Sequence, residues 1–211
     1  MPRRYPGIRR PVKSRSAAPP GARATRHSVA FMIWQTLASR TVYENRWIRV
    51  REDDVIGPDG PGIYGVVEMR HPAVFVVALD PDDRVCLVSL YRYATSRMSL
   101  EVPAGGSDGE DALIAAQREL AEETGYAASE WTEIGRMDAL NGLADAPEHV
   151  FLARDLRRVA DAAHSQHEEG IDDVRWVPFA DVLGLIAAGE ITDGETIAAL
   201  AFAGIHLGRF R

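Results

Sequence analysis

From Trp34 onward, apolar and polar residues alternate in patterns typical of strands and helices. Residues 41–57 alternate at period two, and the alternation resumes over residues 63–70 after the turn sequence GPDGPG, which predicts a β-hairpin. Residues 73–80 and 84–93 predict a second hairpin around the turn sequence PDD. The first strand of this second hairpin is apolar on both faces, so we expect it to be central in its sheet.

The rest of the chain predicts one helix, then more strands, then more helices. A glycine-rich loop after Leu100 leads into a helix predicted over Asp111–Thr124, with Asp111 as its N-cap and Gly125 at its C-terminal end. The later expected elements are strands over 131–140 and 148–156, a strand followed by a helix over 171–191, and a last helix over 193–207. This order predicts an α+β fold with a mixed sheet between helices.

The charge along the chain is unevenly distributed. Residues 1–31 contain eight basic and no acidic side chains and lack hydrophobic periodicity, so we expect them to be disordered. They resemble a targeting peptide or a nucleic-acid-binding arm, and an extension without function is the alternative. The remaining chain has 16 basic and 31 acidic side chains, a net charge of −15. We therefore expect no nucleic-acid binding by the folded body.

The cysteine content and the hydropathy exclude several classes of protein. Cys86 is the one cysteine among 211 residues, so an internal disulfide and a zinc–thiolate cluster are excluded, which is typical of a cytoplasmic protein. We expect Cys86 to be a buried strand residue rather than a reactive thiol. The longest apolar run, residues 73–79, is shorter than the roughly 18 residues of a membrane helix, so we expect no membrane contact.

The predicted helix over 111–124 concentrates negative charge on one face. Glu119, Glu122 and Glu123 project together at helical spacing, and Arg118 can reach Glu122 four residues later. The neighbouring apolar stripe, which we expect to pack against the body, consists of Leu113, Ala116 and Leu120. A solvated helix face with an ion pair is one interpretation. The preceding loop PAGGSDG, with three glycines in seven residues, instead favours a magnesium or manganese site that also holds phosphate.

The same stretch resembles the signature of the Nudix hydrolases. That signature is a glycine, five residues, a glutamate, seven residues, and then Arg-Glu-apolar-any-Glu-Glu-any-Gly-apolar. Glu110, the seven residues after it and RELAEETGY match every fixed position. The departure is that Gly105 lies four residues before Glu110 instead of five. The resemblance implies a Nudix-type α/β/α sandwich with a mixed central sheet and a small N-terminal antiparallel sheet.

The resemblance also implies roles for individual residues. Glu119 and Glu123 would be the main ligands of Mg²⁺, or of Mn²⁺, and Glu122 would assist directly or through water. Arg118 would orient a glutamate, and the backbone carbonyl of Ala104 would complete the metal shell. The implied reaction is attack of water on a diphosphate linkage.

Motifs outside the signature resemble one branch of the family. SLYRYA and LEVPAGG are similar to the ADP-ribose and nucleoside-diphosphate-sugar pyrophosphatases, and the likeness covers about residues 34–205. It implies that Arg92 and Glu101 face the substrate, because a guanidinium can bind paired phosphate oxygens. An ordinary surface strand residue is the alternative for Arg92.

This branch often supplies a catalytic glutamate from a late loop. The matching place here is HSQHEEGIDD, so the resemblance implies that Glu168 or Glu169 acts as a general base or as an additional metal ligand. The choice between them stays open. We expect the flanking His164 and His167 to be solvated.

One position departs from the branch. ADP-ribose hydrolases of the family tend to carry a proline about sixteen residues beyond the signature, whereas this chain has Gly142 there and Pro147 five residues later. We expect ADP-ribose as the first substrate, with GDP-mannose or another nucleotide sugar next.

The expected organisation has three parts. Residues 1–31 would be a disordered basic extension, residues 32–70 an N-terminal sheet that forms a homodimer, and residues 71–211 the Nudix hydrolase domain. The dimer follows from the resemblance. Tyr43 and Trp47 would lie near the partner's nucleotide site or pack in the core.

Two other functions fit the same fold. A Nudix-like domain can sense a nucleotide sugar and regulate a partner without catalysis, and measurable turnover would exclude a purely sensing role. An isoprenoid-diphosphate isomerase would need a catalytic cysteine, for which Cys86 on an apolar strand is a poor candidate. The complete set of Glu119, Glu122 and Glu123 favours a hydrolase over a sensor, because a sensor does not need all the metal ligands.

Overall fold

A computed structural model describes residues 34–159 and 163–210, and the basic extension expected over 1–31 lies outside these residues. The strands are β1 (Gln35–Glu44), β2 (Ile48–Gly57), β3 (Gly60–Met69), β4 (Ala73–Ala78), β5 (Arg84–Arg92), β6 (Arg97–Glu101), β7 (Ala104–Gly106), β8 (Tyr126–Asp138), β9 (Ala144–Asp145), β10 (Pro147–Arg158) and β11 (Ile171–Pro178). The helices are α1 (Ala112–Thr124), α2 (Ala163–Glu168), the 3₁₀ turn η1 (Phe179–Asp181), α3 (Val182–Ala188) and α4 (Gly194–His206).

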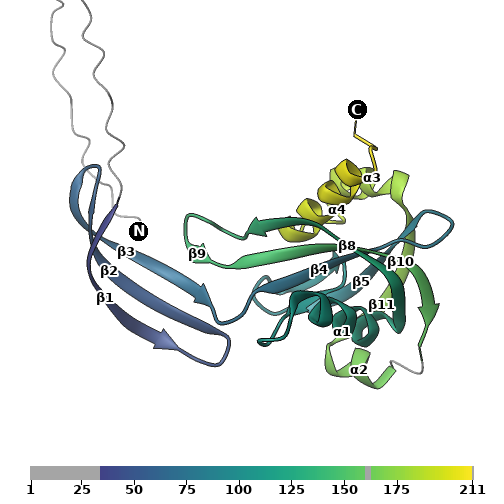
Figure 1. Cartoon of the computed structure of the whole chain (residues 1–211), viewed down its shortest axis with the longest axis horizontal. Coiled ribbons are helices and arrows are strands. Elements are labelled where there is room, and N and C mark those ends of the chain that lie inside the picture. The colour runs from purple at the N-terminus through teal and green to yellow at the C-terminus, as the bar shows by residue number, and fades with distance from the viewer. Residues whose placement is uncertain (1–33, 160–162, 211) are drawn as a thin grey trace, which may run out of the picture. The chain divides into compact units, whose positions relative to one another are not determined.

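The strands form three groups. The first group has the order β1-β2-β3-β9, the second β7-β4-β10-β8 and the third β11-β5-β6. β10 runs parallel to β4 and antiparallel to β8, so the central group is mixed. The order of the elements and this mixed sheet confirm the predicted α+β fold (Figure 1).

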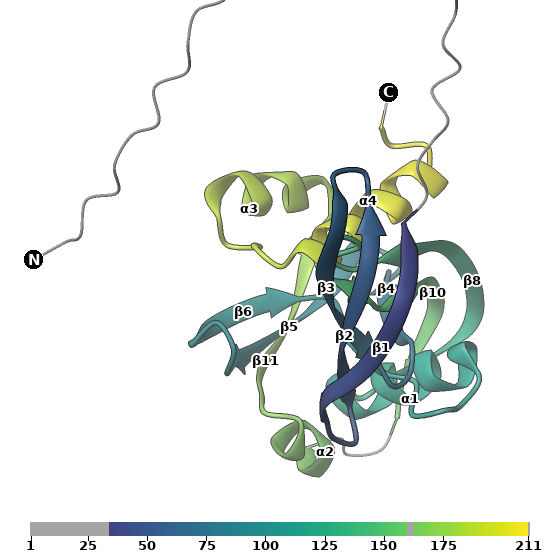
Figure 2. The same cartoon turned by 90° about the vertical axis from the view of Figure 1, so that its left-hand side faces the viewer.

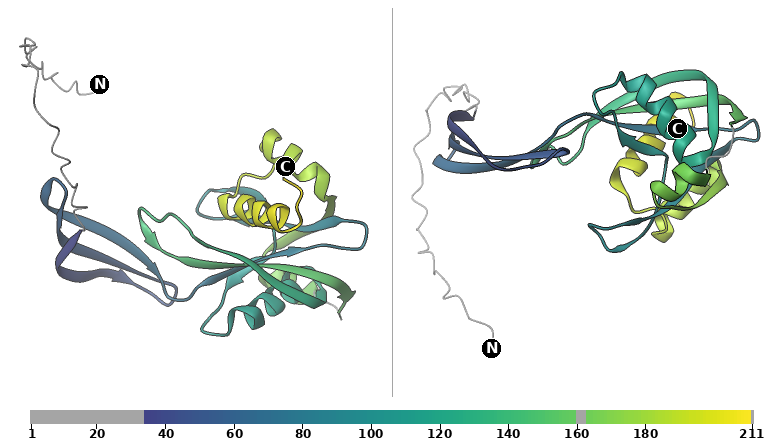
Figure 3. Two further views of the ribbon diagram at one scale, coloured as in Figure 1. Left: turned by 45° about the horizontal axis from the view of Figure 1, so that its top comes forward. Right: turned by 90° about the horizontal axis from the view of Figure 1, so that it is seen from below.

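Strand β4 lies between the two helical layers. Val74 and Val76 belong to a buried cluster with Ala116 and Leu120 of α1. Phe75 and Val77, which alternate with them, belong to the opposite cluster, which includes residues of α4. Since successive strand residues point to opposite faces, a strand covered on both sides must be apolar throughout. α1 and α4 accordingly lie on opposite sides of the sheet (Figure 3), as a sandwich requires.

The first predicted hairpin is wrong in one respect, because residues 41–57 are not a single strand. β1 ends at Glu44 and β2 begins at Ile48, and Figure 2 shows β1, β2 and β3 side by side. The Oδ1 atom of Asn45 accepts the backbone N–H groups of Trp47 at 2.8 Å and Ile48 at 2.9 Å. This asparagine turn reverses the chain inside a stretch whose polarity keeps alternating.

The second predicted hairpin is also wrong, although β4 and β5 are strands and β4 is central. The two strands lie in different groups and share only the isolated bridge between Leu79 and Val85. β7 and β10 occupy both edges of β4, so β5 cannot pair along it. Asp80 holds the sharp turn between them, because its carboxylate accepts the backbone N–H of Arg84 at 2.8 Å.

Helix α1 begins and ends as the sequence predicts. The Asp111 side chain accepts the N–H of Leu113, and Gly125 ends the helix with a φ of 74°. The predicted apolar stripe is partly wrong, since Leu113 is 36% exposed whereas Ala115, Ala116 and Leu120 are fully buried. The two small alanines let the helix lie close to the sheet, and Leu113 in the first turn lines a surface cavity beside Trp131.

The segment from β3 to β4 connects to the loop before β10. β3 pairs with β9 in parallel, and the backbone N–H of Val67 donates to the carbonyl of Leu143 at 3.0 Å. The Tyr64 hydroxyl donates to the carbonyl of Gly142 at 2.7 Å. The loop in which Gly142 replaces the expected proline is therefore attached to β3. Among the helices that the structure describes, none is long and apolar enough to cross a membrane.

Candidate active site

The glycine-rich loop lies directly over a buried carboxylate of α1. A Cβ atom placed on Gly105 would lie 2.2 Å from Oε1 of Glu119 and 2.3 Å from its Cδ, far inside van der Waals contact. Glu119 itself is only 6% exposed. Gly105 is therefore required because the glutamate carboxylate occupies the space that a side chain would need. The loop holds this contact although it is one residue shorter than the usual spacing.

Arg118 ties the loop and the glutamates together. Its Nη1 atom donates to Glu119 at 2.8 Å and to Glu122 at 3.0 Å, and its Nε donates to Glu110 at 3.1 Å. Its Nη2 donates to the carbonyl of Gly106 at 2.9 Å. These acceptors hold the pKa of Arg118 above its ordinary value even though burial opposes the charge. The arginine therefore has the geometry of a residue that orients carboxylates.

Glu123 lies one turn beyond Glu119 and is more deeply enclosed. It is 4% exposed, and its Oε2 accepts the backbone N–H of Ala104 at 2.9 Å. Burial raises the pKa of Glu123 to about 8, and the neighbouring charges of Glu119 and Glu169 add to the effect. Burial also raises the pKa of Glu119. Two carboxylates are thus held close together where their negative charge is poorly solvated.

These residues fit a divalent cation. Among the described residues, no three His, Cys, Asp or Glu side chains are grouped so that they could hold a metal ion as they stand. Arg118 pairs with the carboxylates of Glu119 and Glu122. The donor atoms are nevertheless hard oxygens, which Mg²⁺ and Mn²⁺ prefer. The absence of a side chain at Gly105 also lets the Glu119 carboxylate lie directly against the loop backbone. Glu119, Glu122 and Glu123 are the side chains of α1 that could supply such oxygens.

The predicted substrate residues lie beside this loop. The guanidinium of Arg92 binds Glu101 through two hydrogen bonds, of 2.9 Å from Nε and 2.5 Å from Nη2. The Glu101 side chain is 4% exposed whereas that of Arg92 is 46% exposed. Both residues line a cavity of about 380 Å³ together with Ala104 and Gly105. The structure therefore brings an accessible, fixed guanidinium to the loop that covers Glu119.

The late loop reaches the end of α1. The Gln166 side chain donates to the backbone carbonyl of Glu123 at 3.0 Å, which holds α2 against α1. Glu168 is the last residue of α2, and Glu169 follows in the turn. The charge of Glu169 raises the pKa of both Glu119 and Glu123. His167 is exposed, as expected, and the side chain of His164 lies outside the described residues.

Comparisons with known proteins agree with this geometry. The NUDIX domain model matches residues 69–200, and the model of the nucleoside diphosphate sugar hydrolase N-terminal domain matches residues 34–67. The chain belongs to the Nudix family. It is 33% identical to an ADP-ribose pyrophosphatase of Mycobacterium tuberculosis over 82% of this chain and 81% of that protein. An ADP-ribose pyrophosphatase of Bacillus subtilis is 31% identical over 80% of this chain and 91% of that protein.

A solved structure confirms the Nudix fold. The crystal structure of an ADP compounds hydrolase matches with a TM-score of 0.73 over 86% of this chain and all of that chain, at 24% identity. Nudix hydrolases generally need a divalent metal. The protein is thus a Nudix hydrolase whose carboxylates can supply such a site.

Three further acidic residues of this Nudix domain were missed by the sequence interpretation. Asp193 and Glu195, at the start of α4, line the same cavity as Arg92 and Gly105. Glu148 on β10 is 6% exposed, and the pKa of its carboxyl is raised to about 7 by burial and then by Glu195 and Asp193. A glutamate near the start of a strongly apolar strand is a weak sequence signal. Only the fold brings Glu148 next to Glu195.

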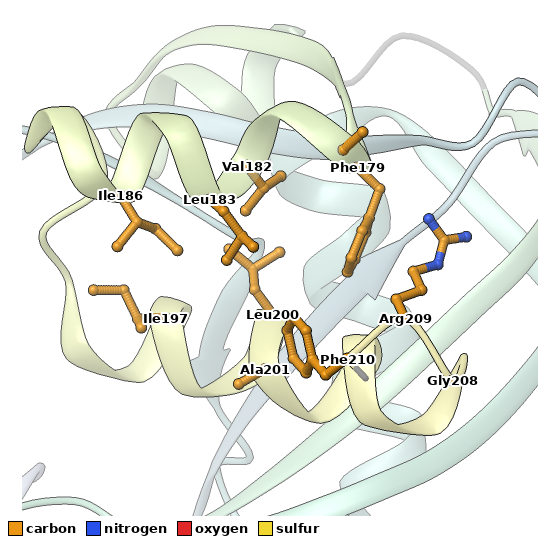
Figure 4. Close-up of a pocket in the computed structure, with 11 residues that line it drawn as sticks. Phe179, Val182, Leu183, Ile186, Ile197, Leu200, Ala201, Gly208, Arg209 and Phe210 are labelled. Carbon is orange, nitrogen blue, oxygen red and sulfur yellow. The ribbon is translucent and has the colours of Figure 1, made fainter.

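Other features of the Nudix domain carry no part of this chemistry. A larger cavity of about 600 Å³ between α3 and α4 has mainly apolar walls, including Leu183, Ile186 and Phe210 (Figure 4). Its charged lining residue, Arg209, is paired with Asp83. Cys86 is fully buried, and burial raises its pKa to about 12, so it does not present the nucleophile that an isomerase would need.

Proposed function

We propose that the protein hydrolyses the diphosphate bond of ADP-ribose or a related nucleoside diphosphate sugar, and releases a nucleoside monophosphate and a sugar phosphate. The observation that carries this proposal is the contact between Gly105 and the buried Glu119, beside a cavity into which Arg92 opens. Relatives that are named ADP-ribose pyrophosphatases, matched over most of both chains, support the substrate class.

The carboxylates of α1 would hold the metal. We assign Glu119 and Glu123 as the main ligands, Glu122 as an assisting group and the carbonyl of Ala104 as a backbone ligand. When bound, Mg²⁺ would neutralise charge on the diphosphate and lower the pKa of an attacking water. Arg118 would keep Glu119 and Glu122 oriented through the hydrogen bonds that it donates to both.

Arg92 would bind the diphosphate, and Glu101 would position it. The two parallel hydrogen bonds to Glu101 fix the plane of the guanidinium and leave the remaining N–H donors for phosphate oxygens. Because Glu101 is nearly fully buried and both of its oxygens bind Arg92, it fixes the arginine in the cavity that both residues line.

We propose Glu169 as the general base or an additional metal ligand, with Glu168 as the alternative. The charge of Glu169 acts on both Glu119 and Glu123, which supports a role close to the proposed metal ligands. Both assignments, general base or additional metal ligand, are compatible with this location.

The direct test measures release of nucleoside monophosphate from ADP-ribose, GDP-mannose, UDP-glucose and NADH, with magnesium and with EDTA. We expect magnesium-dependent cleavage, with ADP-ribose as the preferred substrate of the four. Glu123→Gln should lower kcat by at least about 1,000-fold, because a main metal ligand is lost. Glu130→Gln, an exposed glutamate on β8, is the matched control and should keep full activity.

The outcome also decides between catalysis and sensing. If the unaltered protein cleaves none of the four compounds in magnesium but binds one of them tightly, the proposed hydrolysis is wrong and a sensor domain is favoured. If Glu123→Gln keeps wild-type activity, the assignment of the metal ligands is wrong although the reaction stands.

We further propose that residues 32–70 form the dimerisation subdomain and residues 71–211 the hydrolase domain. Every residue of β1 is exposed, and Tyr43 and Trp47 are 55% and 56% exposed, so a core-packing role within this chain is wrong for both. Large exposed apolar side chains on a sheet are typical of an interaction surface. A second copy of the chain would cover them and bring these aromatic residues towards the partner's nucleotide site.

Light scattering on a sizing column tests the dimer. Leu37→Asp on β1 should convert a dimer into a monomer, because the charge would be buried in the interface. Leu183→Asp, equally exposed on α3, is the control and should stay dimeric. A monomeric unaltered protein would contradict the proposal.

We also propose a cytoplasmic location, which is compatible with Cys86 as a free, buried thiol.

A further inference from the structure

Two arginines lie opposite each other on strands β5 and β6, at the cavity that also contains Gly105. Arg92 is the last residue of β5, Arg97 is the first residue of β6, and the two are register partners in the antiparallel pair. Both line the cavity of about 380 Å³. Like charges directly opposite each other on neighbouring strands are destabilising, so this pair of arginines needs a compensating negative charge.

The fold compensates the charge of Arg92 but not that of Arg97. Both oxygens of Glu101 bind Arg92. The Nη2 atom of Arg97 instead donates to the hydroxyl of Thr192, a neutral acceptor in the loop before α4, at 2.9 Å. Within the described part of the chain, no carboxylate forms an ion pair with Arg97. The exposed Arg97 side chain therefore keeps its charge and its other N–H donors for a ligand.

The acidic side chains that line the cavity have other partners. The carboxylate of Asp193 caps α4, because its Oδ2 accepts the backbone N–H of Thr196 at 2.7 Å. Burial and a hydrogen bond with Asp193 raise the pKa of Glu195, which reduces its negative charge. The third acidic lining residue is Glu101, whose two oxygens are already bound. Arg97 thus brings a positive charge that no carboxylate of the cavity neutralises by direct contact.

The turn between β5 and β6 is closed without Arg97. The backbone N–H of Ser96 donates to the carbonyl of Tyr93 at 3.2 Å, and the Ser96 hydroxyl donates to the same carbonyl at 3.3 Å. The Thr95 hydroxyl donates to the carbonyl of Arg92 at 3.4 Å. Since these local hydrogen bonds hold the turn, the side chain of Arg97 is not needed to form it.

We propose that Arg97 is a specificity-determining residue, which binds one phosphate of the diphosphate while Arg92 binds the other. Two guanidiniums on one strand pair offer two sets of parallel N–H donors, which match the oxygens of two adjacent phosphates. A ligand with one phosphate leaves one of the two cations without an anion, so the pair selects for a diphosphate. The inference rests on the proposed function, because it takes this cavity as the diphosphate site.

Steady-state kinetics with ADP-ribose test the role of Arg97. Arg97→Gln keeps a polar side chain without the charge, and we expect it to raise KM at least about tenfold while kcat changes far less. Arg97→Lys should give an intermediate KM, because the ammonium keeps the charge without the parallel donors. Arg154→Gln, an exposed arginine of β10 outside the cavity, is the matched control and should leave KM unchanged.

Thr192→Val distinguishes binding from a purely structural contact. This change removes the hydroxyl that accepts from Arg97 and keeps the shape of the side chain. If Arg97 binds phosphate, Thr192→Val raises KM much less than Arg97→Gln does. If the two variants raise KM equally, or if Arg97→Gln changes KM by less than about twofold, the proposed phosphate contact is overturned.

A binding measurement separates this result from the proposed reaction. Calorimetric titrations with ADP and with AMP in EDTA need no turnover, and the ratio of the two dissociation constants reports the contribution of the second phosphate. We expect the unaltered protein to favour ADP at least about tenfold and Arg97→Gln to lose most of this preference. A preference below about twofold in the unaltered protein, or the same preference in both proteins, overturns the inference.

The two proposals can fail independently of each other. If the unaltered protein does not hydrolyse ADP-ribose in magnesium but its preference for ADP depends on Arg97, the reaction is wrong and the contact with the second phosphate stands. If hydrolysis is normal and the preference does not depend on Arg97, the inference about Arg97 alone is wrong.

Discussion

Gly105 and Glu119 are in such close contact that the carboxylate of one occupies the side-chain position of the other, with 2.2 Å between Oε1 and a Cβ at residue 105. The flexible carboxylate would have to turn away from any side chain placed there. Since Glu119 is also held by Arg118, such a movement would disturb the whole acidic face of α1.

Gly105→Ala should therefore lower kcat/KM by about 100-fold or more through misplacement of Glu119, with little loss of stability. Magnesium titrations of activity provide the measurement, and a raised magnesium requirement is expected. Gly184→Ala is the matched control, because a Cβ at residue 184 of α3 meets nothing within 4 Å. Normal activity of Gly105→Ala would show that Glu119 tolerates displacement and is not a main ligand.

Arg92→Lys should raise KM for the nucleotide sugar by about tenfold, because an ammonium group cannot make the paired hydrogen bonds of a guanidinium. Glu101→Gln should have a smaller effect in the same direction, since one of the two contacts with Arg92 remains possible. Arg84→Lys offers a control with a similar ion pair to Asp80 outside the cavity. An unchanged KM in Arg92→Lys would show that Arg92 is an ordinary surface residue of the strand and does not bind the substrate.

Glu169→Gln should lower kcat by about 100-fold, as expected on loss of a general base. Glu168→Gln should lower kcat by less than about threefold. Single-turnover kinetics separate the chemical step from product release. The reverse order of the two effects would transfer the role to Glu168.

Glu148 should make stability fall with rising pH. Its pKa is raised from an ordinary value of 4.5 to about 7, first by burial and then by Glu195, so the folded state binds the proton more tightly than the unfolded state. The contribution of this proton on Glu148 to the free energy of unfolding is fully present below pH 4.5 and is lost as the pH rises through about 7. Its full size is about 3 kcal/mol.

Urea denaturation at pH 5 and pH 8 tests this linkage. Glu148→Gln should lose less unfolding free energy between the two pH values than the unaltered protein does. The comparison isolates Glu148, since the raised pKa values of Glu119 and Glu123 act equally in both proteins. Equal losses of unfolding free energy in the two proteins would show that a group other than Glu148 causes the pH dependence.

The sequence alone was sufficient to predict helix α1 with both of its ends, and the presence of the glutamates on it. Asp111, Gly125 and the spacing of the glutamates are local signals, which depend on helix geometry and not on distant contacts. The central position of β4 was predictable for a similar reason, because burial on two faces demands apolar residues at every position.

The tertiary structure alone decided which strands pair and which loops meet. β4 and β5 are neighbours in sequence but belong to different groups, because β7 and β10 compete for the edges of β4. Glu148 and Glu195 are far apart in sequence, and they become neighbours only when β10 and α4 pack on the same sheet. Hydrogen-bond competition at strand edges and long-range packing leave no periodic trace in the sequence, so this part of the site could be found only in the folded chain.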